Sequence, residues 1–122
     1  MRIYDTGPTT GRRLKEPGTI GARMATLVSE RDWHVALLEL EPKGSLGTHR
    51  TTSDQLLIIV QGTARVSTEG DRPLDAAQGS AVFWNRGEQR AVQAGDDGLV
   101  GIIVEGDRLE RNLMMPRKRI SG

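Results

Sequence analysis

The sequence predicts an all-β domain in which antiparallel strands form a small sandwich or barrel. Segments that are apolar or alternate in polarity recur at intervals of roughly eight to twelve residues, separated by turns rich in Gly and Asp. Residues 56–60 form an unbroken apolar run between polar segments, which is typical of a strand buried on both faces. No long stretch has the period of an amphipathic helix, so no helical architecture competes with this prediction.

The composition indicates one soluble domain. A chain of 122 residues can bury one core, and its 36% apolar and 27% charged residues are ordinary for a globular protein. Four aromatic residues are too few for a surface that stacks on nucleic acid, and the absence of Cys excludes disulfides and thiolate metal sites. Because no segment approaches the roughly 18 apolar residues of a membrane span, we expect a cytoplasmic protein without a membrane partner.

The charge is uneven along the chain and matches a division into three parts. The net charge is +2 over residues 1–32, −4 over residues 33–106 and +3 over residues 107–122. We predict an N-terminal arm and edge strand over 1–32, a barrel over 33–106 and a C-terminal tail over 107–122. Short basic runs such as 117–119 are unspecific, so we interpret this one as a solvated tail or an arm on a partner subunit, and we expect no nucleic-acid partner.

The first half of the chain contains one well-defined strand. Residues 1–19 are rich in Gly and Pro and predict an extended arm or loop, whereas 19–27 fits either a short edge strand or a helical turn. Residues 33–41 predict a strand that ends at Pro42, followed by a turn at 43–44. Alternation places a set of residues on its inner face: His34, Ala36, Leu38 and Leu40. His34 is then either a structural histidine at the barrel rim or a second site residue.

The second half predicts a series of strands and turns. After the buried run, residues 62–68 alternate as a half-exposed strand, and residues 69–73 are a hairpin signal. Residues 80–84 predict another buried strand, closed by a turn at 85–88. Residues 89–93 and 99–106 predict two further strands joined by a turn at 94–98, and the last segment predicts a short amphipathic turn before Pro116.

Two spaced motifs indicate a family. The first contains Gly44, His49, Thr51, Gln55 and Gly62, and its spacing from the histidine to the last glycine resembles the first motif of the cupin superfamily. The resemblance covers about residues 33–106. It implies a cupin-like jelly-roll β-barrel of antiparallel strands, whose two motifs bring metal ligands into the barrel.

The second motif keeps its spacing but not its residue types. It runs from Gly79 through five residues to Asn85, Arg86 and Gly87, and reaches Arg90 where cupins have a histidine ligand.

Metal binding is not expected at these positions. Of the four ligand positions that the resemblance implies, only His49 keeps its type, while Thr51, Gln55 and Arg90 replace the others. The set carries no negative charge to offset a divalent cation, and a guanidinium repels one. We therefore expect no cofactor, with a divalent metal at His49 as the less favoured alternative.

The four residues predict a site that binds an anion. If the barrel is cupin-like, His49, Thr51, Gln55 and Arg90 converge on one cavity lined by Leu, Ile and Val. A buried arginine requires an anion, which is either the carboxylate or phosphate of a ligand or a rim carboxylate among Glu39, Glu41 and Glu88.

Three functional hypotheses follow, and the sequence leaves open whether the protein is an enzyme. The first is a protein that binds a small polar or anionic metabolite without a metal. The second is a metal-free isomerase, epimerase or cyclase in which His49 is the general base. The third is a metal-dependent oxygenase that uses His49 with His34 and carboxylates such as Glu39 or Glu41.

We also predict a homodimer. The apolar run at 56–60 and a second run at 99–104 leave both faces of at least two strands in need of cover, which a partner subunit would supply. The resemblance implies the same, because small cupins are often dimers.

Overall fold

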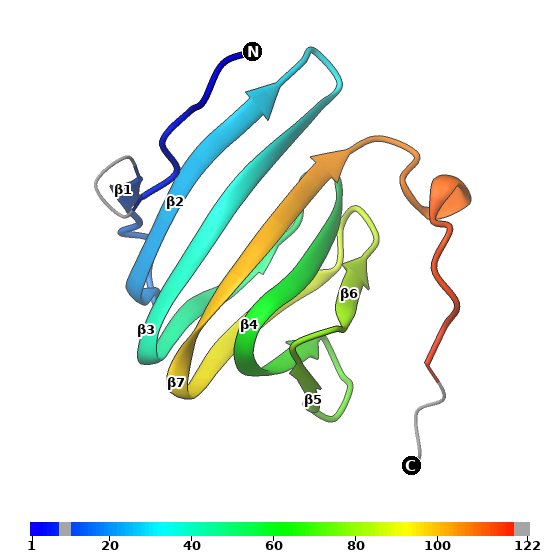
Figure 1. Cartoon of the computed structure of the whole chain (residues 1–122). Helices are drawn as coiled ribbons and strands as arrows, with labels where there is room; N and C mark the ends of the chain where they lie inside the picture. Colours follow the sequence, from blue (N-terminus) through cyan, green and yellow to red (C-terminus); the bar gives the residue numbers. More distant parts are fainter. Residues whose placement is uncertain (8–10, 119–122) are drawn as a thin grey trace.

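The computed structural model describes residues 1–7 and 11–118, which form one twisted antiparallel β-structure (Figure 1). Its elements in chain order are β1 (Arg12–Arg13), β2 (Ile20–Ser29), β3 (Trp33–Arg50), β4 (Asp54–Thr68), β5 (Leu74–Ala77), β6 (Ala81–Trp84), β7 (Gln89–Gly106) and a 3₁₀ turn, η1 (Glu110–Asn112). This architecture is the predicted all-β jelly-roll barrel.

Three long strands build both layers of the barrel. The strand order is β1-β2-β3-β7-β4-β5, and β6 also pairs with β4. Strands β3, β4 and β7 contain 18, 15 and 18 residues, and each bends near its middle. One half of each strand lies in a layer with β2 and β6, and the other half lies in a layer with β5.

The bend depends on two glycines with positive φ, Gly62 at +90° and Gly98 at +78°. A Cβ atom at Gly62 would overlap the carbonyl oxygen of Gly98, and one at Gly98 would lie 2.6 Å from the carbonyl oxygen of Leu40. The backbones of β3, β4 and β7 therefore meet here without room for a side chain, and L-residues also disfavour this conformation.

The sequence predicted that strands end at the turns 42–44 and 94–98, and this prediction is wrong. Strand β3 continues through 42–44, β7 continues through 94–98, and β4 joins the predicted segments 56–60 and 62–68 in one strand. Register shifts, including one between Leu40 and Ser45, and the positive φ of Lys43 (60°) turn each segment into an irregularity within a strand. A β-bulge bends a strand and increases its twist while pairing resumes on both sides, so breaker residues did not end these strands.

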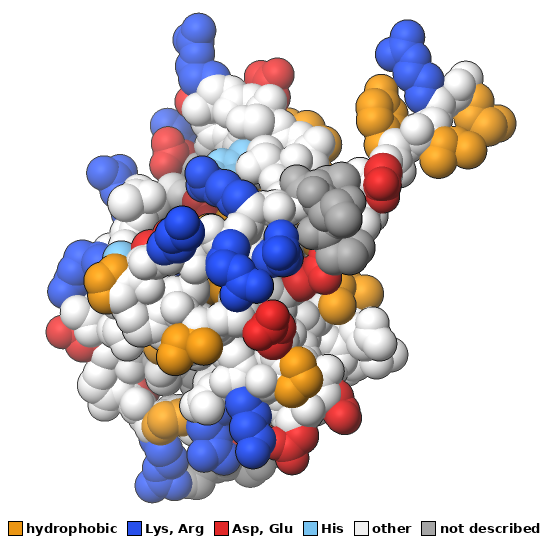
Figure 2. Space-filling view, turned by 90° about the vertical axis from the view of Figure 1, so that its left-hand side faces the viewer, with side chains coloured by type: hydrophobic (Ala, Val, Ile, Leu, Met, Phe, Trp, Pro, Cys, Tyr) orange, Lys and Arg blue, Asp and Glu red, His pale blue; other side chains and the backbone are white. Residues whose placement is uncertain are grey.

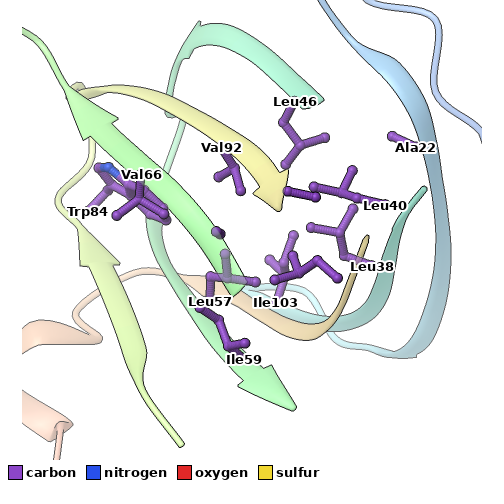
Figure 3. Close-up of a cluster of buried hydrophobic side chains, with 13 residues drawn as sticks. Ala22, Leu38, Leu40, Leu46, Leu57, Ile59, Val66, Trp84, Val92 and Ile103 are labelled. Carbon is purple, nitrogen blue, oxygen red and sulfur yellow. The ribbon is translucent and has the colours of Figure 1, made fainter. Parts of the chain in front are cut away.

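The core lies between the two layers and is apolar throughout (Figure 3). The predicted inner face of β3 is confirmed, because Ala36, Leu38 and Leu40 are all buried. The open choice at 19–27 resolves to strand β2. The prediction that residues 56–60 are buried on both faces is only partly right, since Val60 is 48% exposed and Ile58 is half-buried.

The two ends of the chain lie outside the barrel layers. Residues 1–7 project from the body with Met1, Ile3 and Tyr4 exposed, and Lys and Arg side chains gather on the side of the molecule that faces the viewer in Figure 2. At the C-terminal end, the backbone N–H of Leu109 donates to Asp54 Oδ2 at 3.1 Å. Arg119, part of the predicted basic run, lies outside the described residues, and none of the described helical segments is long and apolar enough to cross a membrane.

The close approach of the strands at the bend predicts that alanine destabilises the protein more at Gly62 than at Gly79, although both glycines have a similar positive φ. Gly62→Ala should destabilise the protein by at least about 3 kcal/mol, because it adds a backbone overlap to the strain of positive φ. Gly79 has φ +89° but no atom within 4 Å of an added Cβ, so Gly79→Ala should cost only about 1–2 kcal/mol. Urea denaturation of both variants measures the difference, and equal costs would show that the close approach at Gly62 is not a constraint.

Candidate functional site

Both ends of each long strand reach the same end of the barrel, because each strand bends near its middle. The start of β3 and the end of β7 belong to one layer, and the end of β3 and the start of β7 belong to the other. Polar residues occupy these positions in both layers. We call this group the mouth cluster, and its members are His34, His49, Gln55, Thr68, Arg90 and Glu105.

Strand register places the mouth cluster on the inward face. Most members continue the alternation of buried core residues along their strand, for example from Ile103 to Glu105 and from Val92 to Arg90, whereas His49 follows Leu46 across a register shift. Cross-strand pairing agrees, since Glu105 lies opposite both His34 and Gln55, and Arg90 lies opposite both His49 and Thr68. The buried side chains of Trp84 and Val66 lie close together within the core near this end (Figure 3).

Glu105 is the centre of one half of the cluster. Gln55 Nε2 donates a hydrogen bond to Glu105 Oε1 at 2.9 Å, and His34 Nε2 lies 3.3 Å from Glu105 Oε2. Gln55 is buried, whereas the side chain of His34 is 38% exposed. This geometry fits the interpretation of His34 as a rim histidine with a polar partner.

Arg90 dominates the other half and lacks a close counter-ion. Its Nε atom is buried and has no hydrogen-bond partner among the described residues. Burial lowers the pKa of Arg90, and the negative charges of Glu105 and Glu16 oppose this effect. No carboxylate in the described part of the chain forms a salt bridge with it, so its charge is only partly compensated.

The rim carboxylates that the sequence offered as partners of Arg90 have other environments. Glu88 accepts hydrogen bonds from Thr68 Oγ1 at 3.1 Å and from the backbone N–H of Asn85 at 2.7 Å. Glu39 and Glu41 line a surface hollow of about 310 Å³ that contains no mouth-cluster residue. None of these three carboxylates forms a salt bridge with Arg90 among the described residues, and the negative charges that oppose the lowering of its pKa are those of Glu105 on β7 and Glu16 in the N-terminal segment.

Thr51 joins the two motifs. Its hydroxyl donates to the carbonyl oxygen of Asn85 at 2.8 Å, its N–H donates to the carbonyl of Glu88 at 2.9 Å, and its carbonyl accepts from the N–H of Gly87 at 3.0 Å. These bonds hold the loop before β4 against the turn before β7. Thr51 thus differs from the other three predicted site residues, because its hydroxyl is already used by the scaffold.

The four predicted residues lie at one end of the barrel and differ in exposure. The barrel interior is filled by the core, and two surface hollows of about 310 and 670 Å³ are lined by other residues. His49 is exposed next to Arg90, while Gln55 is buried beside Glu105. The candidate site is thus an open, polar end of the barrel above an apolar floor.

The donor set at this end does not fit a divalent metal ion. The four motif positions offer one imidazole, a hydroxyl that is already bonded, an amide and a guanidinium. His34 and Glu105 add two donors, but no group of three His, Asp or Glu residues in the described ranges could hold a metal. We therefore derive no chemistry from a metal here.

Solved structures resemble this chain in fold. A cupin-like protein from Thermotoga maritima matches with a TM-score of 0.74 and 18% identity, over 89% of this chain and 84% of that chain. The polyketide cyclase RemF from Streptomyces resistomycificus matches with a TM-score of 0.73 and 18% identity, over 86% and 80% of the two chains. The chain has the cupin fold.

A third similar structure is KdgF from Halomonas sp., with a TM-score of 0.69 and 16% identity over 84% of this chain and 92% of that chain. No protein-family model matches the sequence, and no curated protein matches it. At such low identity the similarity establishes the cupin barrel, and the site chemistry must be argued from this chain's own residues.

Sequence reasoning missed Glu105 and Thr68 as members of the site. The signal was present, because strict alternation from an inward Ile103 places Glu105 inward, and alternation from Val66 does the same for Thr68. Without the pairing of β7 with both β3 and β4, the two residues had no visible connection to the motifs.

The role of Thr51 gives a stability prediction. Thr51→Val preserves the shape but removes the donor to Asn85, so it should reduce stability by about 1–2 kcal/mol. Thr52→Val is the matched control, since Thr52 is exposed and its substitution should change stability by no more than about 0.5 kcal/mol. Chemical denaturation measures both, and an equally small effect at the two positions would contradict the scaffold role.

Proposed function

We propose that this protein binds a small polar carboxylate at the mouth of the cupin barrel without a metal. The observation that carries the proposal is the guanidinium of Arg90, whose buried Nε atom has no hydrogen-bond partner in the described residues. A buried charged donor without a partner costs free energy, which a bound anion can recover. A carboxylate matches the planar guanidinium because it accepts two parallel hydrogen bonds.

The other members of the mouth cluster support a ligand with a second polar group. Glu105 carries a negative charge near Arg90, so the part of the ligand beside it must donate a hydrogen bond rather than present another anion. The exposed imidazole of His49 lies across from Arg90 and can contact the solvent side of the ligand. A small hydroxy or amino acid satisfies these requirements better than a di-anion.

A second candidate function, metal-free proton transfer, is favoured by the contact of His34 with Glu105. A histidine beside a carboxylate is held in one orientation and can act as a general base. The sequence assigned this role to His49, but the described contacts give His49 no carboxylate partner, whereas His34 has one at 3.3 Å. Proton abstraction next to a carboxylate fixed by Arg90 is the class of reaction that this arrangement supports.

The binding proposal is tested with a panel of small hydroxy and amino acids in a thermal-shift assay, followed by calorimetry of the best ligand. A specific carboxylate should raise Tm, and Arg90→Met should lower affinity at least about tenfold by removing the charge-assisted hydrogen bonds. Ligand-free Arg90→Met should be at least as stable as the wild type, because an unpartnered buried charge has been removed. Arg72→Met changes an exposed arginine in the β4–β5 turn and serves as the control.

Two results would contradict the proposal. One is a wild-type protein that no carboxylate in the panel stabilises, combined with a large loss of stability in Arg90→Met, which would make Arg90 a structural residue. The other is a ligand whose affinity falls equally in Arg90→Met and Arg72→Met, because this would indicate a general charge effect.

Proton transfer is tested by incubating the bound hydroxy or amino acid in D₂O and following the loss of its α-proton signal by NMR. His34→Gln should slow this exchange at least about 100-fold while leaving affinity within about threefold, since general-base contributions are typically of that size. His49→Gln is the comparison variant. Exchange that depends on His49 and not on His34 would restore His49 as the general base, as the sequence predicted. If the wild-type protein shows no exchange, the proton-transfer function is wrong and only the binding function remains.

A further inference from the structure

Residues 14–19 form a strap that crosses from strand β2 to the half of β3 that leads to the mouth. At its start, the backbone N–H of Leu14 donates to the carbonyl oxygen of Ala22 at 2.9 Å, and the Leu14 side chain packs against the core. At its end, Thr19 Oγ1 accepts a hydrogen bond from the backbone N–H of Gly47 at 2.9 Å. The segment is therefore fixed at both ends, and we call it the N-terminal strap.

The middle of the N-terminal strap lies directly against the backbone of β3. A Cβ atom at Gly47 would overlap the carbonyl oxygen of Pro17, so a glycine is required for this close approach. Gly47 is followed two residues later by His49, which lies opposite Arg90. The contact at Gly47 thus brings Glu16, the residue before Pro17, to the border of the mouth cluster, where its negative charge acts on Arg90.

Two carboxylates act on Arg90, and they differ in what else they contact. Both oxygens of Glu105 already have a partner, because Oε1 accepts from Gln55 Nε2 at 2.9 Å and Oε2 lies 3.3 Å from His34 Nε2. Glu16 is exposed, and its carboxylate forms no salt bridge with any residue that the structure describes. Glu16 therefore supplies a negative charge beside Arg90 that is available to a ligand.

This arrangement of charges disfavours a ligand that is only an anion. The carboxylate of such a ligand gains the guanidinium of Arg90 but is also repelled by Glu16 and Glu105. An ammonium group on the same ligand offsets the repulsion, because it attracts both carboxylates. In an α-amino acid a single carbon atom separates the carboxylate from the ammonium group, so the ammonium group must find its acceptor close to Arg90. Glu16 is the available carboxylate that meets this requirement.

We propose that the ligand of the mouth is a small α-amino acid, and that Glu16 selects it by accepting a hydrogen bond from its ammonium group. This inference rests on the proposed binding of a carboxylate by Arg90, and it adds the residue that discriminates an amino acid from a hydroxy acid. A charge-assisted hydrogen bond is stronger than a neutral one, so an ammonium group is favoured over a hydroxyl group at the same position. Because the strap already fixes the backbone around Glu16, ordering this residue on binding costs less entropy.

The test compares pairs of ligands that differ only in the group on the α-carbon: L-alanine with L-lactate, and L-serine with L-glycerate. Calorimetry on the wild-type protein should give at least one pair in which the amino acid binds at least about tenfold more tightly than its hydroxy acid. The amide of that amino acid, which lacks the carboxylate, and its N-acetyl derivative, which lacks the ammonium group, should each bind at least about tenfold more weakly than the amino acid.

Glu16→Gln should change the two affinities of that pair in opposite directions. The amino acid loses the charged partner of its ammonium group and should bind about tenfold more weakly. The hydroxy acid should bind as tightly as before or up to about threefold more tightly, because a negative charge beside Arg90 has been removed. Glu41→Gln is the matched control, since Glu41 is also an exposed glutamate but lies at the bend, and it should leave both affinities unchanged.

The outcomes separate this inference from the proposed function on which it rests. If amino and hydroxy acids bind equally well and both lose affinity in Arg90→Met, the selection of an amino acid is wrong and carboxylate binding stands. An amino-acid preference that is the same in Glu16→Gln as in the wild type would also overturn the role of Glu16. If no carboxylate of either kind binds, or if binding survives in Arg90→Met, the proposed function fails and this inference fails with it.

Discussion

The close approach of three backbones at the bend is the constraint on which this structure depends. Gly62 and Gly98 allow β3, β4 and β7 to bend where their backbones meet. A Cβ atom at either glycine would contact a carbonyl oxygen of the neighbouring strand. Because all three strands bend there, their two ends return to one side of the molecule. The same feature thus closes the apolar core between the layers and assembles six polar residues from three strands at the opposite end of the barrel.

At that end, the mouth cluster lies directly above an apolar floor, and this position controls its electrostatics. Burial lowers the pKa of Arg90, and the nearby charges of Glu105 and Glu16 compensate only part of the lost hydration. Gln55 donates to Glu105 and limits the freedom of that carboxylate to move toward Arg90. The Arg90 guanidinium therefore remains only partly compensated at this end of the barrel, and the proposed binding of a carboxylate is argued from this feature.

The two faces of the long strands have different roles. Inward residues form the core and the mouth, whereas outward residues at the same level form a continuous apolar surface across five strands. Substitutions on the outward face can thus change that surface while leaving the polar end intact, because successive residues of a strand point to opposite sides. The open edge of the sheet is the short strand β1, whose two exposed arginines oppose pairing with a strand of another molecule.

The sequence alone determined the strand content, the inner face of residues 36–40, and the spacing that relates His49, Gln55 and Arg90 to the cupin motifs. These features depend on local polarity and on intervals along the chain. Only the tertiary structure decided that 42–44 and 94–98 are bends within strands, because a breaker segment ends a strand only if pairing does not resume beyond it. The same long-range pairing placed Glu105 and His34 together at the end of the barrel that also contains Arg90. It also brought Thr51 to Asn85, where its hydroxyl donates a structural hydrogen bond.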